Sequence, residues 1–252
     1  FKVRSSNGEY ICDCTVLATG SDATQGKNSH FLAEKLGHRT TEIKYAISPL
    51  LCKEVRGANG VRAKVSASIF INGEIAMQER GEVLFKDGAL SGVLIFRLSS
   101  MLARYRGEVK NCNVVLDLVP DMSQEELENH IYENCSVFAP LEGVLHKAIA
   151  HGVYARTPMD RSLIMSRKKA RDIARVCKEF NIEVTALSGR SSAQAASGGI
   201  STDGIDGETM RSRICDGLYI IGEVADVDGL CGGYNLHWAW ASALACSEDI
   251  LC

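Results

Sequence analysis

The sequence predicts an α/β protein in which one α/β domain is interrupted by a long insertion. Two observations favour this class. Both ends of the chain, residues 1–44 and 182–252, combine buried strand-like runs with helices. Between them the pattern is first rich in β-strands, over residues 45–119, and then helical, over residues 120–181. The four segments are therefore expected to form the first part of the domain, a β-rich insert, a helical insert and the C-terminal part of the domain.

The N-terminal segment begins with a predicted β-hairpin. Phe1–Arg4 and Tyr10–Ala18 flank an Asn-Gly turn, which is a strong hairpin signal. The second run becomes wholly apolar at Thr15–Ala18, as expected for a strand that enters a buried sheet. A short helix is expected over Ser29–Leu36, with Ser29 as its N-cap.

The β-rich segment consists of short apolar runs separated by turn residues, which predicts several antiparallel strands. Asn72 and Gly73 lie between two such runs and predict a second hairpin. The apolar run Ala89–Leu98 is interpreted as a further strand of the same module.

The helical segment carries start signals. Ser123 and Glu126 have the spacing of a capping box, in which each side chain accepts a hydrogen bond from a free backbone N–H at the helix start. Asp160 is the expected cap of the next long helix, Ser162–Phe180. The predicted apolar stripe of this helix consists of Ile164, Ile173, Val176, Cys177 and Phe180.

Composition and charge disfavour several functions. The 252-residue chain has a net charge of −3, which does not favour a nucleic-acid partner, and the basic run Arg167–Arg171 is interpreted as a solvated helix face. No apolar run approaches the roughly 20 residues of a membrane span, and no signal peptide is visible. The ten cysteines include no CxxC pair and the six histidines are scattered, so we expect a cytoplasmic protein without a metal site.

Two strand ends and one helix start point to a ligand site. The N-terminal strand ends at Gly20, and the strand at 217–224 ends with Gly222 and Glu223. In open parallel sheets, ligands bind outside the carboxyl ends of strands, where glycine allows a close approach. A helix begins near Leu236 after a glycine-rich loop, and its free N–H groups can bind a phosphate or an electron-rich carbonyl. Each of these features also fits an ordinary glycine turn.

The combination of motifs is more specific than its parts. The chain contains VLATG near its start, GEVLFKDGALSGVLIFRLS and VVLDLVPD in its middle, and ASGGIST and GLYIIGEVADVDGLCGGYNLHWAWASA near its end. Together they resemble the HI0933-like, BaiN-type family of FAD-dependent flavoproteins, also called aminoacetone-oxidase-like. The resemblance covers essentially all 252 residues.

The resemblance implies a Rossmann-like FAD-binding domain interrupted by the β-rich and helical inserts. It places one group of residues against the adenosine diphosphate, a second near the ribityl chain and pyrophosphate, a third at the isoalloxazine edge and a fourth in a turn close to the flavin. In that order, the implied cofactor-binding residues are Ala18, Thr19 and Gly20; Gly222 and Glu223; Gly232, Gly233, Tyr234, Asn235 and Leu236; and Gly198 and Gly199.

The chain departs from the family pattern in three places. Ser21 replaces a glycine after VLATG, and Ala89 and Val93 replace a glycine and a proline in GEVLFKDGALSGVLIFRLS. The GxGxxG motif with which the family opens does not occur in the sequence. The expectation is therefore a Rossmann-like domain that is incomplete, without its first βαβ unit. We expect this chain alone to bind FAD poorly and to be only marginally stable.

The function implied is hydride transfer among NADH or NADPH, FAD and a small organic substrate, possible examples being enone-like compounds. No partner other than that small molecule is expected, and the oligomeric state stays open. Cys231 and His237 lie close to the implied flavin-binding loop, but both are interpreted as passive rather than catalytic. The alternative is a catalytically inactive remnant that acts only as a folding or binding module.

Overall fold

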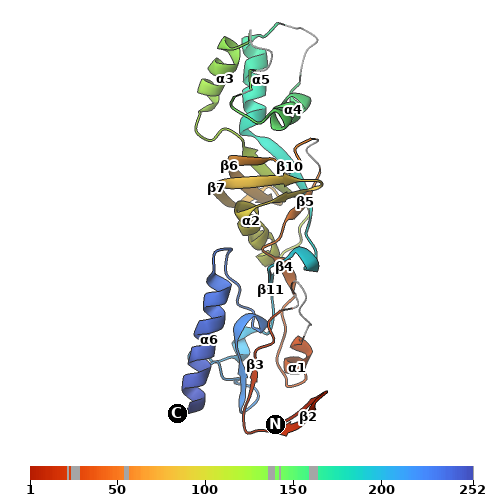
Figure 1. Ribbon diagram of the computed structural model, residues 1–252, viewed down its shortest axis with the longest axis vertical. Helices are drawn as coiled ribbons and strands as arrows, with labels where there is room; N and C mark the ends of the chain where they lie inside the picture. The colour runs from red at the N-terminus through yellow and green to blue at the C-terminus, as the bar shows by residue number, and fades with distance from the viewer. Residues whose placement is uncertain are drawn as a thin grey trace. The chain divides into compact units, whose positions relative to one another are not determined.

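The computed structural model describes residues 1–21, 23, 29–53, 57–135, 140–141, 143–158 and 164–251 (Figure 1). The chain divides into two compact units. Residues 1–48 and 188–252 form one, called the terminal unit below, and residues 49–187 form the other, the central unit. The expected segment boundaries lay four to six residues earlier, at 44/45 and 181/182.

The central unit is built on a closed barrel of six strands, in which all neighbouring strands are antiparallel. Strands β6 and β9 alternate between inward and outward side chains, so that Val65, Ala67 and Ile69 face a core that Val114 and Leu116 also enter. In barrel order the strands are β10 (Phe180–Leu187), β5 (Leu50–Cys52), β8 (Ala89–Ser91), β7 (Glu74–Lys86), β6 (Arg62–Ile71) and β9 (Cys112–Asp117).

The predicted hairpin at Asn72 and Gly73 is confirmed. These two residues connect β6 to β7, and both have positive φ, 54° and 88°, as a two-residue turn of this kind requires. Residues 180–187 were expected to be divided between the helical insert and the C-terminal part of the domain. They instead form one strand, which pairs with both β9 and β5 and completes the barrel.

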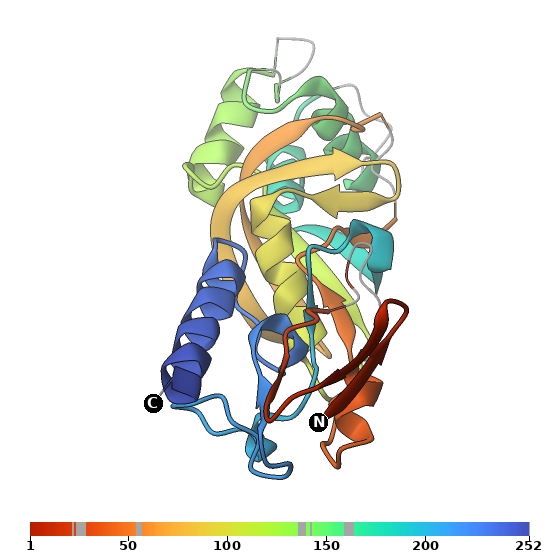
Figure 2. The ribbon, with the colours of Figure 1, turned by 60° about the horizontal axis from the view of Figure 1, so that its bottom comes forward.

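The interpretation of Ala89–Leu98 as a single strand is wrong. Strand β8 ends at Ser91, Gly92 turns the chain with a φ of 101°, and helix α2 (Val93–Arg104) follows. Its buried residues include Leu94, Leu98 and Leu102, which lie four residues apart on one face. Through this face α2 packs against β7 (Figure 2).

Three further helices complete the central unit: α3 (Gln124–Glu133), α4 (Lys147–Arg156) and α5 (Arg167–Lys178). The predicted capping box is confirmed, because Ser123 and Glu126 each accept the other's backbone N–H. The predicted cap Asp160 lies outside the described residues. In the structure α5 begins after Ser166, whose hydroxyl accepts the backbone N–H of Lys169.

The apolar stripe of α5 agrees in part with the one expected. Ile173 and Cys177 are buried as predicted, and with Ala170 and Ala174 they join the same hydrophobic core as the barrel strands, against which Val176 packs. Ile164 precedes the helix and is 78% exposed, and Phe180 begins strand β10.

The described residues of the terminal unit form three pairs of strands and two α-helices. The predicted N-terminal hairpin is present as β1 (Lys2–Ser5) and β2 (Gly8–Ile11). Strand β3 (Thr15–Leu17) pairs in parallel with β12 (Leu218–Ile220), and β4 (Lys44–Ala46) pairs in antiparallel with β11 (Ala195–Ser197). The helices are α1 (His30–Glu34), which follows Ser29, and α6 (Tyr234–Leu251). Among the described residues, no helix has the length and apolar character that a bilayer span requires.

Neighbouring leucines on β5 provide a test of the barrel core. Leu50 is fully buried, whereas Leu51 is 37% exposed. Because truncation in a packed core removes buried area and leaves a cavity, we expect Leu50→Ala to lower the free energy of unfolding by about 2–5 kcal/mol. The matched Leu51→Ala change should cost less than about 1 kcal/mol. Urea unfolding of both variants measures the difference, and equal losses would contradict the barrel register.

Candidate functional site

A cleft of about 520 Å³ lies in the terminal unit, where strands β3 and β12 end. Its volume is within the range of sites for small molecules and cofactors. Eight of the twelve residues implied by the resemblance line it: Ala18, Gly20, Gly222, Glu223, Gly232, Gly233, Asn235 and Leu236. The remaining lining residues are Ile47, Gln194, Ile221, Leu230, Cys231 and Ala239.

The parallel pairing of β3 with β12 brings the two glycine motifs to one edge. Leu17 lies opposite Ile220, and the backbone N–H of Ile221 donates to the carbonyl of Leu17 over 3.1 Å. Immediately beyond these residues, Gly20 and Gly222 have φ values of 66° and 70°, which L-residues rarely adopt. A Cβ atom on Gly20 would meet no atom of the described residues within 4 Å, so on their side the backbone is open to a ligand.

Helix α6 is hydrogen-bonded to the backbone of Gly222. The indole N–H of Trp238 donates to the Gly222 carbonyl, and the Gly222 N–H donates to the hydroxyl of Ser242, both over 3.0 Å. Trp238 and Ser242 are four residues apart and therefore lie on the same face of α6. Ser242 is 1% exposed, so its bond to Gly222 is shielded from water. This clamp sets the position of the helix relative to the strand end.

The C-terminal end of α6 is held separately, through Asp249. The carboxylate of Asp249 accepts the hydroxyl of Tyr219 over 2.6 Å and an N–H of Arg211 over 2.8 Å. The Tyr219 hydrogen bond, together with the bond and charge of Arg211, holds the pKa of Asp249 below its ordinary value. Since Tyr219 belongs to β12, both ends of α6 are attached around the same strand.

The loop before α6 is closed by Asn235. Its Oδ1 atom accepts the N–H of Gly229 over 2.6 Å, and its Nδ2 atom donates to the carbonyl of the same residue over 3.3 Å. A Cβ atom on Gly229 would lie 2.4 Å from the Cβ of Tyr234, so the turn requires glycine there. The first N–H groups of α6 have no acceptor within the helix, and they give the cleft a local positive potential.

Among the described residues that line the cleft, Glu223 is the one with a formal charge. Its Oε1 atom accepts the backbone N–H of Ala196, on β11, over 2.9 Å. The carboxylate thus ties β11 to the end of β12 and still borders the cleft, where it can accept a hydrogen bond from a ligand hydroxyl.

Four of the twelve implied residues do not line the cleft. Thr19 accepts a hydrogen bond from Ser29, and the side chain of Tyr234 is exposed. Gly198 and Gly199 serve close backbone packing, because their Cβ atoms would lie 2.2 Å from the Glu42 carbonyl oxygen and 2.7 Å from that of Val224. A direct cofactor contact of these four residues stays a prediction.

Ile47 and Gln194 line the cleft but were not predicted from the sequence. Ile47 is buried and has a φ of 51°, a backbone conformation that is costly for a β-branched residue, by about 1–3 kcal/mol. Its carbonyl accepts the backbone N–H of Gln194 over 3.2 Å. No sequence signal marks either position, since the pairing of β4 with β11 joins segments about 150 residues apart.

The other two side chains considered from the sequence are those of Cys231 and His237. Cys231 lines the cleft and His237 does not. Among the described residues, no group of three or more His, Cys, Asp or Glu side chains is placed to hold a metal ion.

A parallel strand pair with a glycine-rich cleft at its carboxyl edge, closed by a helix start, is typical of a Rossmann-type nucleotide-binding fold. The sequence profile of the HI0933-like protein Rossmann domain matches residues 1–249, and the chain belongs to that family.

Named relatives show two activities. The chain is 28% identical over 259 residues to a 3-dehydro-bile acid delta(4,6)-reductase of Clostridium scindens, and the matched region covers 96% of this chain and 63% of the relative. It is 28% identical over 257 residues to a ribosomal RNA dihydrouridine synthase of Escherichia coli, and that match covers 97% of this chain and 62% of the relative. A protein of the same name from Haemophilus influenzae is 24% identical over 260 residues, covering 99% and 63%. The chain thus spans slightly less than two thirds of the length of these relatives.

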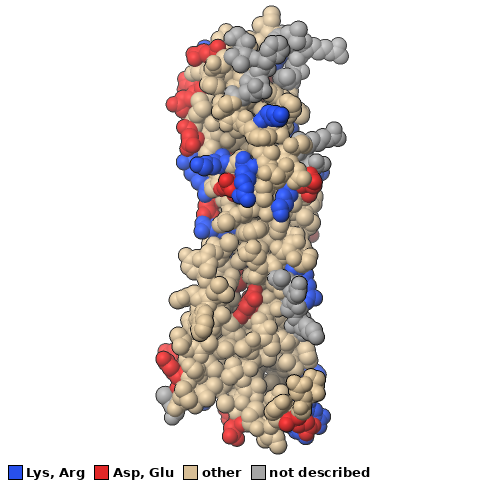
Figure 3. All heavy atoms as spheres, in the orientation of Figure 1, with Lys and Arg blue, Asp and Glu red and all other residues tan. Residues whose placement is uncertain are grey.

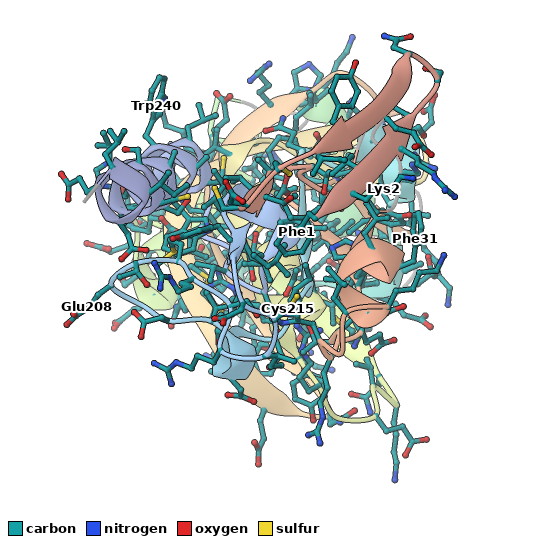
Figure 4. All side chains as sticks on the ribbon, turned by 90° about the horizontal axis from the view of Figure 1, so that it is seen from below. Phe1, Lys2, Phe31, Glu208, Cys215 and Trp240 are labelled. Atoms are coloured by element: carbon teal, nitrogen blue, oxygen red, sulfur yellow. The ribbon has the colours of Figure 1, made fainter. Side chains whose placement is uncertain are left out.

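The two tryptophans of the chain allow a matched test of the Gly222 clamp. Trp238 donates to Gly222, whereas Trp240 is 72% exposed and points away from the helix (Figure 4). We expect Trp238→Phe and Ser242→Ala each to lower the free energy of unfolding by about 1–3 kcal/mol, because each leaves a polar group of Gly222 without its partner. Trp240→Phe should change it by less than about 0.5 kcal/mol. Urea unfolding checks this, and a Trp240 effect as large as that of Trp238 would contradict the clamp.

Proposed function

We propose that the protein is an FAD-dependent oxidoreductase that uses NADH or NADPH to reduce a small organic substrate. The observation that carries the proposal is the cleft at the carboxyl edge of β3 and β12, with glycines on two sides and the start of α6 on a third. Membership of the HI0933-like family supports a nucleotide cofactor in this place.

The residues of the cleft fit a flavin nucleotide. The space beside Gly20 and Gly233 is open where a side chain would project, so an extended ligand can approach the backbone there. We assign Ala18 and Gly20 to the adenosine diphosphate, and Gly222 and Glu223 to the ribityl chain and pyrophosphate. Residues 232–236 are assigned to the isoalloxazine ring. When bound, FAD supplies reversible two-electron storage as hydride.

The protein's own contribution is electrostatic and steric. The N–H groups at the start of α6 would stabilise negative charge on a bound flavin ring, and they would need no reorientation because the Gly222 clamp and Asn235 already hold them. Ile47, Ile221 and Leu230 give the cleft an apolar wall that limits the access of water. Glu223 supplies a hydrogen-bond acceptor for ligand hydroxyl groups.

The relatives suggest the class of substrate. A 3-dehydro-bile acid with double bonds at positions 4 and 6 and the uracil ring of uridine both contain a carbon–carbon double bond conjugated with a carbonyl group. Saturating such a bond adds a hydride to the β-carbon and a proton to the α-carbon. NADH or NADPH would be the source of the hydride and would be oxidised to NAD+ or NADP+, and solvent would supply the proton. We therefore propose an alkene conjugated with a carbonyl as the electron acceptor.

A small substrate is favoured over RNA by the charge distribution. Arg171 forms an ion pair with Glu128 of α3, and Arg167 bonds to Asn129 and stacks on Tyr132, so the basic run of α5 is engaged with its neighbouring helix. On the face drawn in Figure 3, basic side chains lie among acidic ones rather than forming a patch of one sign. An RNA ligand relies on such a patch.

The absorbance spectrum of the purified protein, produced as its gene encodes it, tests the proposal. We expect the bands of an oxidised flavin, with FAD identified after release, and bleaching when NADH or NADPH is added without oxygen. Cyclohex-2-en-1-one should then restore the oxidised spectrum. A colourless protein that gains no flavin on incubation with FAD would favour the alternative, a non-catalytic binding module.

A matched pair of glycines tests where the flavin binds. Gly233 in the cleft and Gly73 in the β6–β7 turn have φ values of 91° and 88°, and a Cβ atom on either would meet no atom within 4 Å. Alanine should therefore destabilise the fold equally at both, by about 1–2 kcal/mol. Only Gly233→Ala should also weaken FAD binding, by about tenfold or more, because its methyl group enters the cleft. Flavin-to-protein ratios after dialysis measure this, and equal retention by both variants would contradict the assignment.

A further inference from the structure

We propose that the side-chain amide of Gln194 binds the carbonyl oxygen of the substrate, with Ile47 as the apolar surface beside it. This inference rests on the proposed function and adds to it the residue that recognises the reacting group. It starts from the two lining residues that belong to neither glycine motif.

Gln194 is the side chain of the cleft with an uncommitted amide. Asn235 uses both of its amide atoms on Gly229, and Glu223 accepts from Ala196. The amide of Gln194 makes no hydrogen bond with any residue that the structure describes, and its side chain is exposed to the cleft. An amide N–H₂ group is a neutral donor, which suits an uncharged carbonyl ligand.

The backbone that carries Gln194 is held on both sides. Its own N–H donates to the Ile47 carbonyl, and the next residue, Ala195, pairs with Ala46 in the β4–β11 ladder. One residue further, the N–H of Ala196 is bound by Glu223, which stands at the end of β12. The base of the Gln194 side chain is therefore fixed relative to the strand end on which the cofactor is proposed to lie.

The conformation of Ile47 also points to the cleft. Glycine or asparagine adopts a φ of 51° at less cost than a β-branched residue, so the backbone there gains nothing from isoleucine. What isoleucine supplies is a branched apolar side chain that lines the cavity next to Gln194. Strained residues of this kind concentrate at ligand sites, where the surrounding structure holds them in place.

The proposed reaction needs a hydrogen-bond donor at the carbonyl oxygen of the substrate. When hydride adds to the β-carbon of a conjugated carbonyl compound, negative charge develops on the carbonyl oxygen, and protonation of the α-carbon then removes it. A fixed amide N–H that already binds the oxygen stabilises this charge without reorganisation. The same amide can pair with an imide edge, which presents both an acceptor and a donor.

The test compares Gln194→Ala and Gln194→Glu with the matched control Gln78→Ala, a change on an exposed glutamine of β7 in the central unit. The probe is cyclohex-2-en-1-one, and the protein is the flavin-loaded form produced as its gene encodes it. Its dissociation constant is measured without turnover, from quenching of tryptophan fluorescence, since Trp238 contacts the cleft residue Gly222. The flavin-to-protein ratio and the rate of bleaching by NADH or NADPH are measured in parallel.

We expect both Gln194 variants to raise the dissociation constant of the probe about tenfold, the effect of losing one hydrogen bond, with flavin content and bleaching unchanged. Gln78→Ala should change none of these. An unaltered dissociation constant would overturn the proposal, and so would a loss of flavin or a slower bleaching, which would place Gln194 against a cofactor instead. A wild-type protein that neither holds flavin nor bleaches would refute the proposed function itself, whatever the probe affinity of the variants.

Discussion

The backbone of Gly222 is held from two directions by α6, and the geometry of the candidate site depends on that contact. Trp238 donates to the carbonyl of Gly222 and Ser242 accepts its N–H, so a helix is fixed against a strand end by two hydrogen bonds at one residue. The helix start then faces the cleft at a set distance from Gly20 and Glu223. Without the clamp, the glycines of the loop would leave the helix free to shift. Trp238, within the aromatic run after the glycines, and Ser242 therefore support the site.

The glycine motifs of the site could be predicted from the sequence because their role is local. A strand that ends in glycine, or a helix that follows a glycine pair, shows its backbone requirement in the residues themselves, and Gly20, Gly222 and Gly233 all line the cleft. Gly198 and Gly199 carry an equally clear signal, but the close approach they permit is to the backbone of Glu42 and Val224. A glycine pair indicates that another group approaches the backbone closely. It does not indicate whether that group belongs to a ligand or to another segment of the protein.

Other features could not be predicted, because they depend on contacts between distant segments. Nothing near Ile47 in the sequence indicates a positive φ, which is imposed by the pairing of β4 with β11. Likewise the run before Leu98 contains valine, isoleucine and phenylalanine and has the composition of a strand. Its helical period becomes visible only when Leu102 is included and when β8 is seen to end at Ser91. The barrel closure by β10 is of the same kind, since helices α3, α4 and α5 separate this strand in the chain from both of its partners, β9 and β5.

The pairing of β3 with β12 also sets an order for folding. Residues 15–17 meet residues 218–220, and the whole central unit lies between them in the chain. During synthesis the central unit emerges as a contiguous segment and can complete its core while the first 48 residues still lack their partners. The cleft is therefore assembled only after residues 218–239 have been synthesised, so a nascent chain cannot capture a cofactor there while its central unit is still folding.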